Sequence, residues 1–199
     1  MEGTMRKNKV IAFILIKYIV FGLCAACFTG CAPKDLLDPS EYEGEIWSAP
    51  PTVKVELDDT GYNQKGAPAI DISAVKNEYE SYQLFITPKE KVDSFYLFAD
   101  DLSDGNGNNL SKSTVTIYYQ KYVSAYLEEV PYKKGWYSDP LIPIDKVKDA
   151  GELSIGENQN GALWITYYIP KDTVAGVYTG TFSLEIKDRC YAIPVTVRV

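Results

Sequence analysis

Apolar and polar residues alternate with a two-residue period along most of the chain. The pattern is clearest in seven segments: 53–57, 79–86, 95–98, 115–119, 162–169, 178–186 and 192–199. Strict alternation is typical of strands that bury one face, and the abundance of tyrosine, valine, isoleucine and threonine agrees with it. We therefore predict an all-β protein, an antiparallel β-sandwich of about eight strands.

The segments between these strands carry turn signals. Residues 104–109 read Asp-Gly-Asn-Gly-Asn-Asn and predict a hairpin turn, because glycine and asparagine accept positive φ. The same stretch resembles a calcium loop, but Asn109 stands where glycine is needed and Val115 where a bidentate acid is needed. We predict no metal site there, and one short helical turn at 144–150.

Residues 1–30 have the pattern of a bacterial lipoprotein signal peptide. A basic segment at 5–9 precedes an apolar run at 10–20, which only Lys17 interrupts. Phe28-Thr29-Gly30-Cys31 then resembles a lipobox, with Cys27 as the competing lipidation candidate. A transmembrane helix fits less well, because the run is shorter than the ~20 residues that cross a bilayer. We predict lipidation at Cys31, which would anchor the protein to the membrane, outside the cytoplasm in the bacterial cell envelope.

The sequence after Cys31 divides into two parts. Residues 31–51 are rich in proline and acidic residues and predict a flexible tether, with Trp47 expected to pack on the domain edge. Residues 52–199 have the length of one domain, which would be the β-sandwich.

Removing the signal changes both charge and cysteine count. Residues 1–30 hold four of the 20 basic and one of the 27 acidic residues, which leaves 16 and 26, a net charge of −10. So acidic a protein is not expected to bind nucleic acid. With Cys31 lipidated, only Cys190 remains in the mature chain, so we expect no intramolecular disulfide and a buried Cys190 thiol in a strand.

Catalytic chemistry has little support in the sequence. The chain has no histidine, which excludes Ser-His-Asp and Cys-His catalysis and histidine zinc sites. Acidic pairs such as Asp100/Asp101 and Glu128/Glu129 are neighbours in sequence, and neighbours on a strand point to opposite faces. Glycosidase carboxylates must instead converge across a cleft. We predict no catalytic residue and no cofactor.

A binding role has more candidates. Residues 133–143 contain a glycine and two prolines and predict a long, shaped loop, of a kind that is often functional. In it, Trp136, Tyr137 and Asp139 are the candidates for contacting a ligand or a second domain. Further tyrosines nearby leave two alternatives open, a glycan-binding face or ordinary core packing: Tyr118, Tyr119, Tyr122, Tyr126 and Tyr132.

Three ordered motifs resemble one known family. They are VKNEYESYQL at 75–84, GWYSDPLIP at 135–143, and the run at 158–180 that contains NQ, LWI and PKDTVAGVYTG. They are similar to motifs of the N-terminal domain of glycoside hydrolase family 123. The resemblance implies a β-sandwich that precedes a catalytic (β/α)₈ barrel, in a family that cleaves β-linked N-acetylgalactosamine from glycans with help from the substrate's acetamido group.

The family's catalytic residues belong to the barrel, which the resemblance places after Val199. No position of this sequence therefore corresponds to a catalytic residue of the family. The motif residues have structural explanations of their own. Asn77 and Glu78 are expected to hold a turn through side-chain hydrogen bonds to backbone. Residues 171–176 are expected to form a tight connection, and Trp164 to alternate into the core.

Two hypotheses of different class follow. In the first, the chain is a non-catalytic accessory module of a lipid-anchored glycoside hydrolase-like protein, which supports or docks a catalytic barrel. In the second, it is a standalone surface lipoprotein whose sandwich binds a glycan or a protein partner. The coding sequence beyond codon 199 distinguishes the two.

Overall fold

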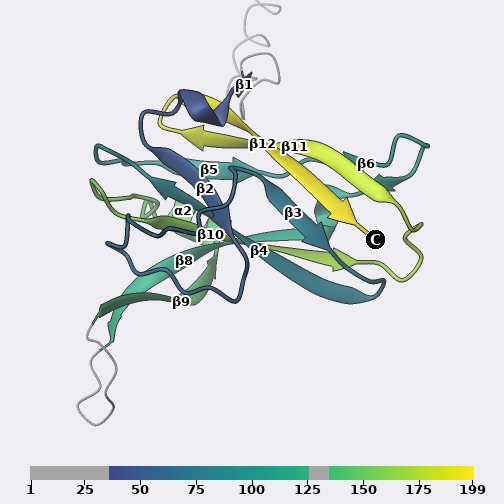
Figure 1. Ribbon diagram of the computed structural model, residues 1–199, viewed down its shortest axis with the longest axis horizontal. Coiled ribbons are helices and arrows are strands. Elements are labelled where there is room, and N and C mark those ends of the chain that lie inside the picture. The colour runs from purple at the N-terminus through teal and green to yellow at the C-terminus, as the bar shows by residue number, and fades with distance from the viewer. Residues whose placement is uncertain (1–35, 126–134) are drawn as a thin grey trace, which may run out of the picture. The chain divides into compact units, whose positions relative to one another are not determined.

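The alternating pattern produces two β-sheets with a shared core in the computed structural model, which describes residues 36–125 and 135–199 (Figure 1). Sheet A has seven strands: β1 (Leu36–Leu37), β3 (Ile70–Ser73), β5 (Phe95–Phe98), β6 (Leu102–Ser103), β7 (Asn109–Leu110), β11 (Val177–Ile186) and β12 (Arg189–Arg198). Sheet B has five: β2 (Glu45–Ala49), β4 (Glu78–Thr87), β8 (Val115–Ala125), β9 (Gly135–Pro143) and β10 (Gly161–Ile169). Three short helices complete the described residues: η1 (Pro39–Glu41), η2 (Lys112–Thr114) and α2 (Ile144–Asp149).

The predicted all-β sandwich is confirmed. Sheet A runs β1-β12-β11-β6-β7, with β3 also paired to β12 and β5 to β11, and sheet B runs β2-β4-β10-β8-β9. All of these pairs are antiparallel except β1–β12 and β3–β12. The described residues form twelve strands rather than about eight, and three of the extra strands (β1, β6 and β7) have only two residues.

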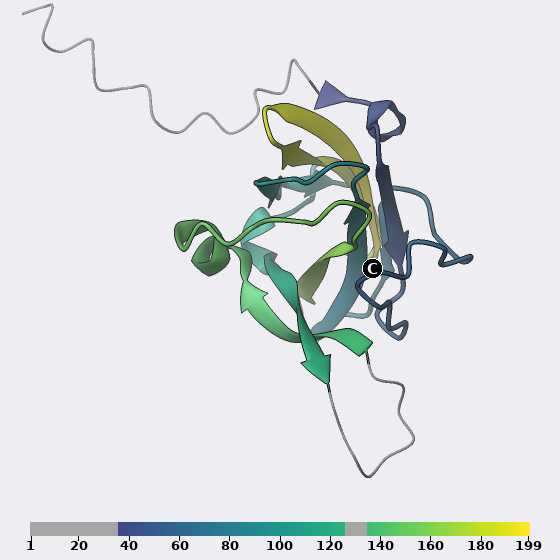
Figure 2. The same cartoon turned by 90° about the vertical axis from the view of Figure 1, so that its left-hand side faces the viewer.

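The main core lies between the sheets and follows the predicted alternation. In β11 the buried residues are Tyr178, Phe182, Leu184 and Ile186, while Thr179 and Thr181 are exposed. β10 likewise buries Leu163, Ile165, Tyr167 and Ile169. Figure 2 shows the two layers edge-on.

A second apolar cluster covers part of the opposite face of sheet B. It consists of Trp47, Ala49, Val55, Phe85, Tyr122 and Ala162. The predicted strand at 53–57 is wrong: this segment crosses over the cluster, and only Glu56 forms a β-bridge, to Tyr137. Val55 alternates with polar neighbours because one side of the segment faces the sheet and the other faces solvent.

The sandwich includes residues that the sequence predicted to be tether. Residues 36–49 form β1, η1 and β2, and η1 is capped by Asp38, whose carboxylate accepts a hydrogen bond of 2.8 Å from Ser40 N. Trp47 is 2% exposed and stacks on Phe85 with ring centroids 4.2 Å apart. The ordered sandwich therefore begins well before residue 52.

Cys190 also differs from its prediction. It lies in β12 as expected, but it is only partly buried and it is disulfide-bonded. The prediction of a buried free thiol is therefore wrong, whereas the prediction of no intramolecular disulfide concerns the mature chain with Cys31 lipidated and stays a prediction. The other three cysteines, the predicted signal segment with Cys31, and Tyr126 and Tyr132 lie outside the described residues.

The turn predictions are confirmed. The β6–β7 turn is organised by Asp104, whose carboxylate accepts hydrogen bonds from Asn106 N at 2.8 Å and from the Asn108 side chain at 2.7 Å. These bonds, led by that from the Asn108 side chain, hold the pKa of Asp104 below its usual value. Gly105 and Gly107 supply the positive φ that the turn needs. The predicted helical turn at 144–150 is α2.

Candidate functional site

The predicted loop at 133–143 is, from Gly135 onward, the edge strand β9. Its two prolines led to the prediction of a loop, because proline lacks the N–H that a central strand donates. At a sheet edge, however, proline is tolerated. Gln120 pairs with Leu141 and Tyr122 with Ser138, so β9 carries one extra residue opposite Lys121. This β-bulge, at Asp139 and Pro140, bends the edge of the sheet.

The three predicted site residues on β9 have different environments. Trp136 is 49% exposed, and its carbonyl accepts a hydrogen bond of 3.3 Å from Leu57 N. Tyr137 is partly buried and folds back over Gly135, where a Cβ would lie 3.3 Å from the tyrosine ring and 3.4 Å from Glu56 Oε2. Asp139 is exposed on the bulge. Trp136 and Asp139 are thus available at the surface, whereas Tyr137 is held by the fold.

The motif residues near 77 and 171 form turns, as predicted, and Glu78 bonds to backbone as predicted. The Asn77 side chain instead accepts a hydrogen bond of 3.1 Å from the Tyr168 hydroxyl. Asn77 has a positive φ of 62°, and Glu78 Oε1 accepts a hydrogen bond of 2.8 Å from Val75 N. The segment after β10 turns through a hydrogen bond of 3.1 Å from Thr173 N to Pro170 O. Both turns lie at the same end of the sandwich, since Asn77 N donates to Ile169 O at 2.7 Å.

The prediction that Trp164 is buried in the core is wrong. Leu163 and Ile165 take the inward positions of β10, so Trp164 lies on the outer face of sheet B, opposite Gln83 of β4 and Tyr118 of β8. The next residues of β10 on this outer face are Thr166 and Tyr168. The Tyr168 ring lies 4.8 Å from that of Tyr79 on β4. The aromatic residues Tyr79, Tyr118, Trp164 and Tyr168 form what we call the outer aromatic face.

Exposed apolar side chains gather at one end of the sandwich. Six large hydrophobic residues of the described chain are strongly exposed, and four of them lie at this end: Val75, Tyr79, Val174 and Val177, at 65%, 71%, 50% and 51% exposure. Three of them lie near the end of β12, since Ala74 N donates to Arg198 O, Val177 pairs with Arg198, and Gly176 exchanges hydrogen bonds of 3.1 and 2.9 Å with Val199. Tyr79 lies at the same end on the outer face of sheet B. Figure 1 shows β12 ending there beside β3. We call these four residues the apolar end.

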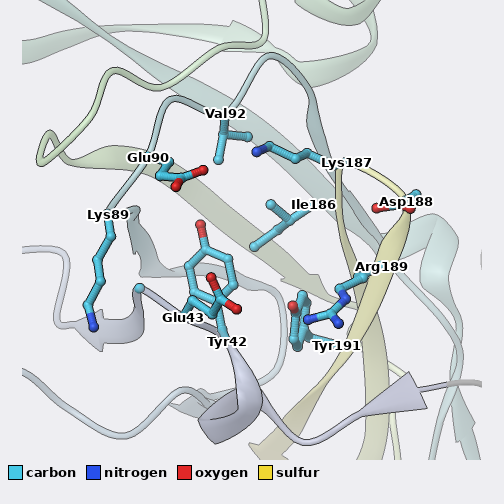
Figure 3. A pocket seen from close by; sticks show the side chains of 11 residues that line it. Tyr42, Glu43, Lys89, Glu90, Val92, Ile186, Lys187, Asp188, Arg189 and Tyr191 are labelled. Atoms are coloured by element: carbon cyan, nitrogen blue, oxygen red, sulfur yellow. The ribbon is translucent and has the colours of Figure 1, made fainter.

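A pocket of about 250 Å³ lies at the opposite end of β11 and β12 (Figure 3). Three segments build it: residues 42–44 after η1, residues 89–92 between β4 and β5, and residues 186–191 around the β11–β12 turn. Its floor is Tyr42, Val92, Ile186 and Tyr191. Its rim carries six exposed charged residues of both signs: Glu43, Lys89, Glu90, Lys187, Asp188 and Arg189.

Local contacts fix the shape of this pocket. A Cβ on Gly44 would lie 2.7 Å from a ring carbon of Tyr42 and would collide with the Thr87 carbonyl, so only glycine fits. The Tyr42 ring packs edge-on against Tyr191, with centroids 5.4 Å apart. Burial, reinforced by Tyr191 and Glu43 nearby, raises the pKa of Tyr42 to about 12, so its hydroxyl stays protonated at neutral pH. Lys187, with φ of 56°, forms the turn that closes the pocket.

Metal and membrane sites have no support in the described part of the chain. Residues 36–125 and 135–199 contain no group of three or more His, Cys, Asp or Glu side chains placed to hold a metal ion. They also include no helix whose length and hydropathy suit a bilayer span.

Comparison with known proteins identifies the family. The model of the glycoside hydrolase 123 N-terminal domain matches residues 57–186, more than half of the chain. The chain belongs to this family. The predicted resemblance is thereby confirmed, and the matched range contains all three motifs that suggested it.

A solved structure agrees with the glycoside hydrolase 123 N-terminal fold. The chain is similar to a family 123 glycoside hydrolase from Clostridium perfringens, studied for glycolipid glycan hydrolysis, with a TM-score of 0.66 and 16% identity. The alignment covers 78% of this chain but only 27% of that enzyme's chain. At this identity the likeness shows the fold. No curated protein matches the chain.

The family match separates the two ends of the domain. The apolar end lies within residues 57–186, whereas seven of the eleven residues lining the pocket lie outside this range: Tyr42, Glu43, Gly44, Lys187, Asp188, Arg189 and Tyr191. Sequence reasoning missed the pocket, because its segments are far apart and residues 42–44 were assigned to the tether. The Gly44 following Tyr42 and Glu43 was the only local signal.

Proposed function

We propose that the chain is a non-catalytic accessory module of a glycoside hydrolase-like protein, and that it supports or docks a catalytic (β/α)₈ barrel. The observation that carries the proposal is that the chain belongs to the family 123 N-terminal domains. The alignment with the related enzyme covers only 27% of that enzyme's chain. The remainder of a homologous protein would hold the catalytic machinery.

The apolar end supports docking. Monomeric proteins seldom gather exposed hydrophobic side chains at one place unless the place is an interface. Val174 and Val177 flank the β12 terminus, so a domain continuing from Val199 would begin beside them. Burying four such side chains favours association, because apolar area removed from water contributes roughly 25 cal/mol per Å². The docking surface that we propose is therefore the apolar end rather than β9.

The coding sequence beyond codon 199 is the first test. A continuation that encodes a (β/α)₈ barrel supports the proposal, whereas a stop codon followed by an unrelated gene contradicts it. In a protein that includes the barrel, amide hydrogen exchange at 174–177 should be slower than in the chain of 199 residues. Val177→Lys should remove this protection, while Leu141→Lys, at an exposed apolar position on β9, should preserve it.

Catalytic silence is tested separately. The chain of 199 residues should not hydrolyse an aryl β-N-acetylgalactosaminide, because we assign it no pair of converging catalytic carboxylates. Reproducible hydrolysis that survives repurification would contradict the accessory role.

A second candidate function is glycan binding by a standalone surface lipoprotein. The outer aromatic face favours it: Tyr79 contacts Tyr168, Trp164 lies opposite Tyr118 in the register of sheet B, and sugar rings stack on such side chains. Between these residues, Ser81 and Thr166 provide hydroxyl groups 2.9 Å apart. Glycan-array binding that Trp164→Ala abolishes would favour this function over docking.

In either case we propose that the protein is lipid-anchored through Cys31 in the bacterial cell envelope. Mass spectrometry of the mature N-terminus should find a diacylglyceryl group on Cys31, and Cys31→Ser should abolish membrane association. The same experiment identifies the disulfide partner of Cys190, since one sulfur cannot carry both a thioether and a disulfide. A Cys31–Cys190 peptide would refute the lipid proposal.

A further inference from the structure

We propose that the pocket at the β11–β12 turn binds a single neutral sugar ring, at a site separate from the apolar end and from the outer aromatic face. Neither docking nor the outer aromatic face uses this pocket, which Figure 3 shows.

The size of the pocket limits the ligand. Its volume of about 250 Å³ lies just below the ~300–1,000 Å³ typical of pockets for drug-sized molecules. One six-membered sugar ring fits this space, whereas an oligosaccharide would extend from the open mouth into solvent. The pocket could therefore hold one residue of a longer glycan.

The division between floor and rim matches the two faces of a sugar. The floor is apolar and aromatic: Val92, Ile186 and Tyr191 are 2–3% exposed, and the Tyr42 ring stands in the middle of the pocket (Figure 3). A pyranose presents C–H groups on its ring faces and hydroxyl groups around its edge. Its ring face would contact Tyr42, and its hydroxyl groups would reach the rim.

The rim suits hydroxyl groups better than a charged ligand. Three acidic and three basic residues surround the pocket, so its net formal charge is zero. All six are exposed to solvent, where an ion pair with a charged ligand gains little. A hydroxyl group, in contrast, can donate to a carboxylate and accept from an ammonium group at the same time. Alternating signs are thus useful to a polyhydroxylated ligand.

Several rim groups are available for such bonds. Within residues 36–125 and 135–199, the side chains of Lys89 and Glu90 have no hydrogen bond or ion pair. In Figure 3 the Tyr42 hydroxyl and the Lys187 side chain point toward Glu90. Arg189, by contrast, is occupied by a hydrogen bond to Tyr191 and serves to hold the floor. Glu90, Lys187 and the Tyr42 hydroxyl are therefore the groups that we expect to contact the sugar.

The test uses saturation-transfer NMR on the full chain, with galactose, glucose, mannose, N-acetylgalactosamine and N-acetylglucosamine as probes. At least one should bind with a Kd in the millimolar range, the strength that a ligand of this size can reach in a shallow site. Glucosamine and glucuronate, which keep the six-membered ring but carry a charge, should bind more weakly than glucose.

Two substitutions distinguish this pocket from other sites. Glu90→Gln and Lys187→Asn should each raise the Kd about fivefold, the effect of one hydrogen bond. Asparagine tolerates the positive φ at 187, so the turn is kept. Glu157→Gln and Lys171→Asn remove the same charges elsewhere on the surface and should leave the Kd unchanged.

Three outcomes would overturn the proposal. One is the absence of binding by every neutral probe at concentrations well above the millimolar range. Another is binding that Trp164→Ala abolishes and the pocket variants leave intact, since the sugar would then lie on the outer aromatic face. The third is preference for a charged probe. None of them bears on barrel docking, which is tested at Val177.

Discussion

The two ends of the sandwich are built on the same strands but present opposite surfaces. β11 begins at Val177 in the apolar end and finishes at Ile186 in the floor of the pocket. At the first end, uncharged side chains project singly into solvent, with exposures of 50–71%. At the second, apolar side chains are buried and charged ones surround them. The first surface suits a large partner, and the second suits a small molecule.

The difference arises in the connections rather than in the strands. At the pocket end, residues 88–92 are held inward by hydrogen bonds from Asn158 N to Pro88 O and between Val92 and Ile155. Tyr42 and Gly44 then close the space from the side of β2. At the apolar end the connections are tight turns, such as the one closed by the hydrogen bond from Thr173 N to Pro170 O. Loops of this kind leave neighbouring apolar residues uncovered.

The largest expected effect comes from the core that both ends share. Phe182→Ala should destabilise the domain by about 3–5 kcal/mol, because Phe182 is fully buried in the middle of β11 and its loss leaves a cavity. Urea unfolding measures this change. The two ends should lose structure together, which would show that they belong to one cooperative unit.

Tyr167→Phe is the control for this substitution. Its hydroxyl is buried without a hydrogen-bond partner among the described residues, and its ring stacks near Phe182 at 6.3 Å. Removing only the hydroxyl should leave stability unchanged or raise it. A loss of more than about 1 kcal/mol would mean that this hydroxyl has a bonding partner.

The next effect should spare the apolar end. Asn160 is 1% exposed; its side-chain oxygen accepts from Thr87 Oγ1 at 2.7 Å, and its amide donates to the carbonyls of Glu56 and Asp59 at 3.0 and 3.1 Å. Asn160→Ala should cost about 1–3 kcal/mol, because it leaves buried polar groups unpaired. Hydrogen exchange should accelerate at 88–92 and not at 174–177. Equal acceleration at both ends would show that the two ends are not energetically separate.

The strands were predictable because burial on one face enforces a two-residue period. β4, β5, β10 and β11 were located to within one residue at each end. Failures occurred where another rule outweighed the pattern. β9 contains two prolines that only its position at the sheet edge tolerates. Residues 53–57 alternate in polarity because they cover the outer face of a sheet, although they do not form a strand of it. Trp164 was placed on the wrong face because a single residue of register reverses every side chain.

The pocket was beyond sequence reasoning for a different reason. Tyr42, Glu90 and Lys187 are separated by 48 and 97 residues along the chain and meet only through the pairing of the strands. Nothing in their local patterns indicates this meeting. The apolar end is an intermediate case, since its residues lie in recognisable motifs but their exposure does not follow from the motifs.

A smaller effect concerns Tyr42 and pH. Its pKa is about 12 in the folded protein and about 10 in an unfolded chain, so between these values the unfolded state releases the proton first. The contribution of Tyr42 to the free energy of unfolding is therefore fully present below about pH 10 and is lost as the pH rises toward 12. Burial raises the pKa of other tyrosines too, including Tyr122 and Tyr167.

Tyr42→Phe should reduce this alkaline loss, measured as the difference in urea midpoint between about pH 8 and about pH 11. Tyr79→Phe, at a ring that is 71% exposed, should leave the loss as it is in the wild type. If Tyr42→Phe and Tyr79→Phe behave alike, the Tyr42 ring is more hydrated than its burial in the structure implies, and a sugar would gain less from contact with it.

The smallest effect on stability should accompany one of the largest effects on docking. Val177→Thr changes a side chain that is 51% exposed, keeps the branched shape that strands favour, and should alter the free energy of unfolding by no more than about 0.5 kcal/mol. In a protein that includes the barrel, the same substitution should weaken contact between the two domains, measured as faster hydrogen exchange at 174–177. If it instead destabilises the isolated domain by more than about 1 kcal/mol, Val177 contributes to the core, and the apolar end loses one of its four residues.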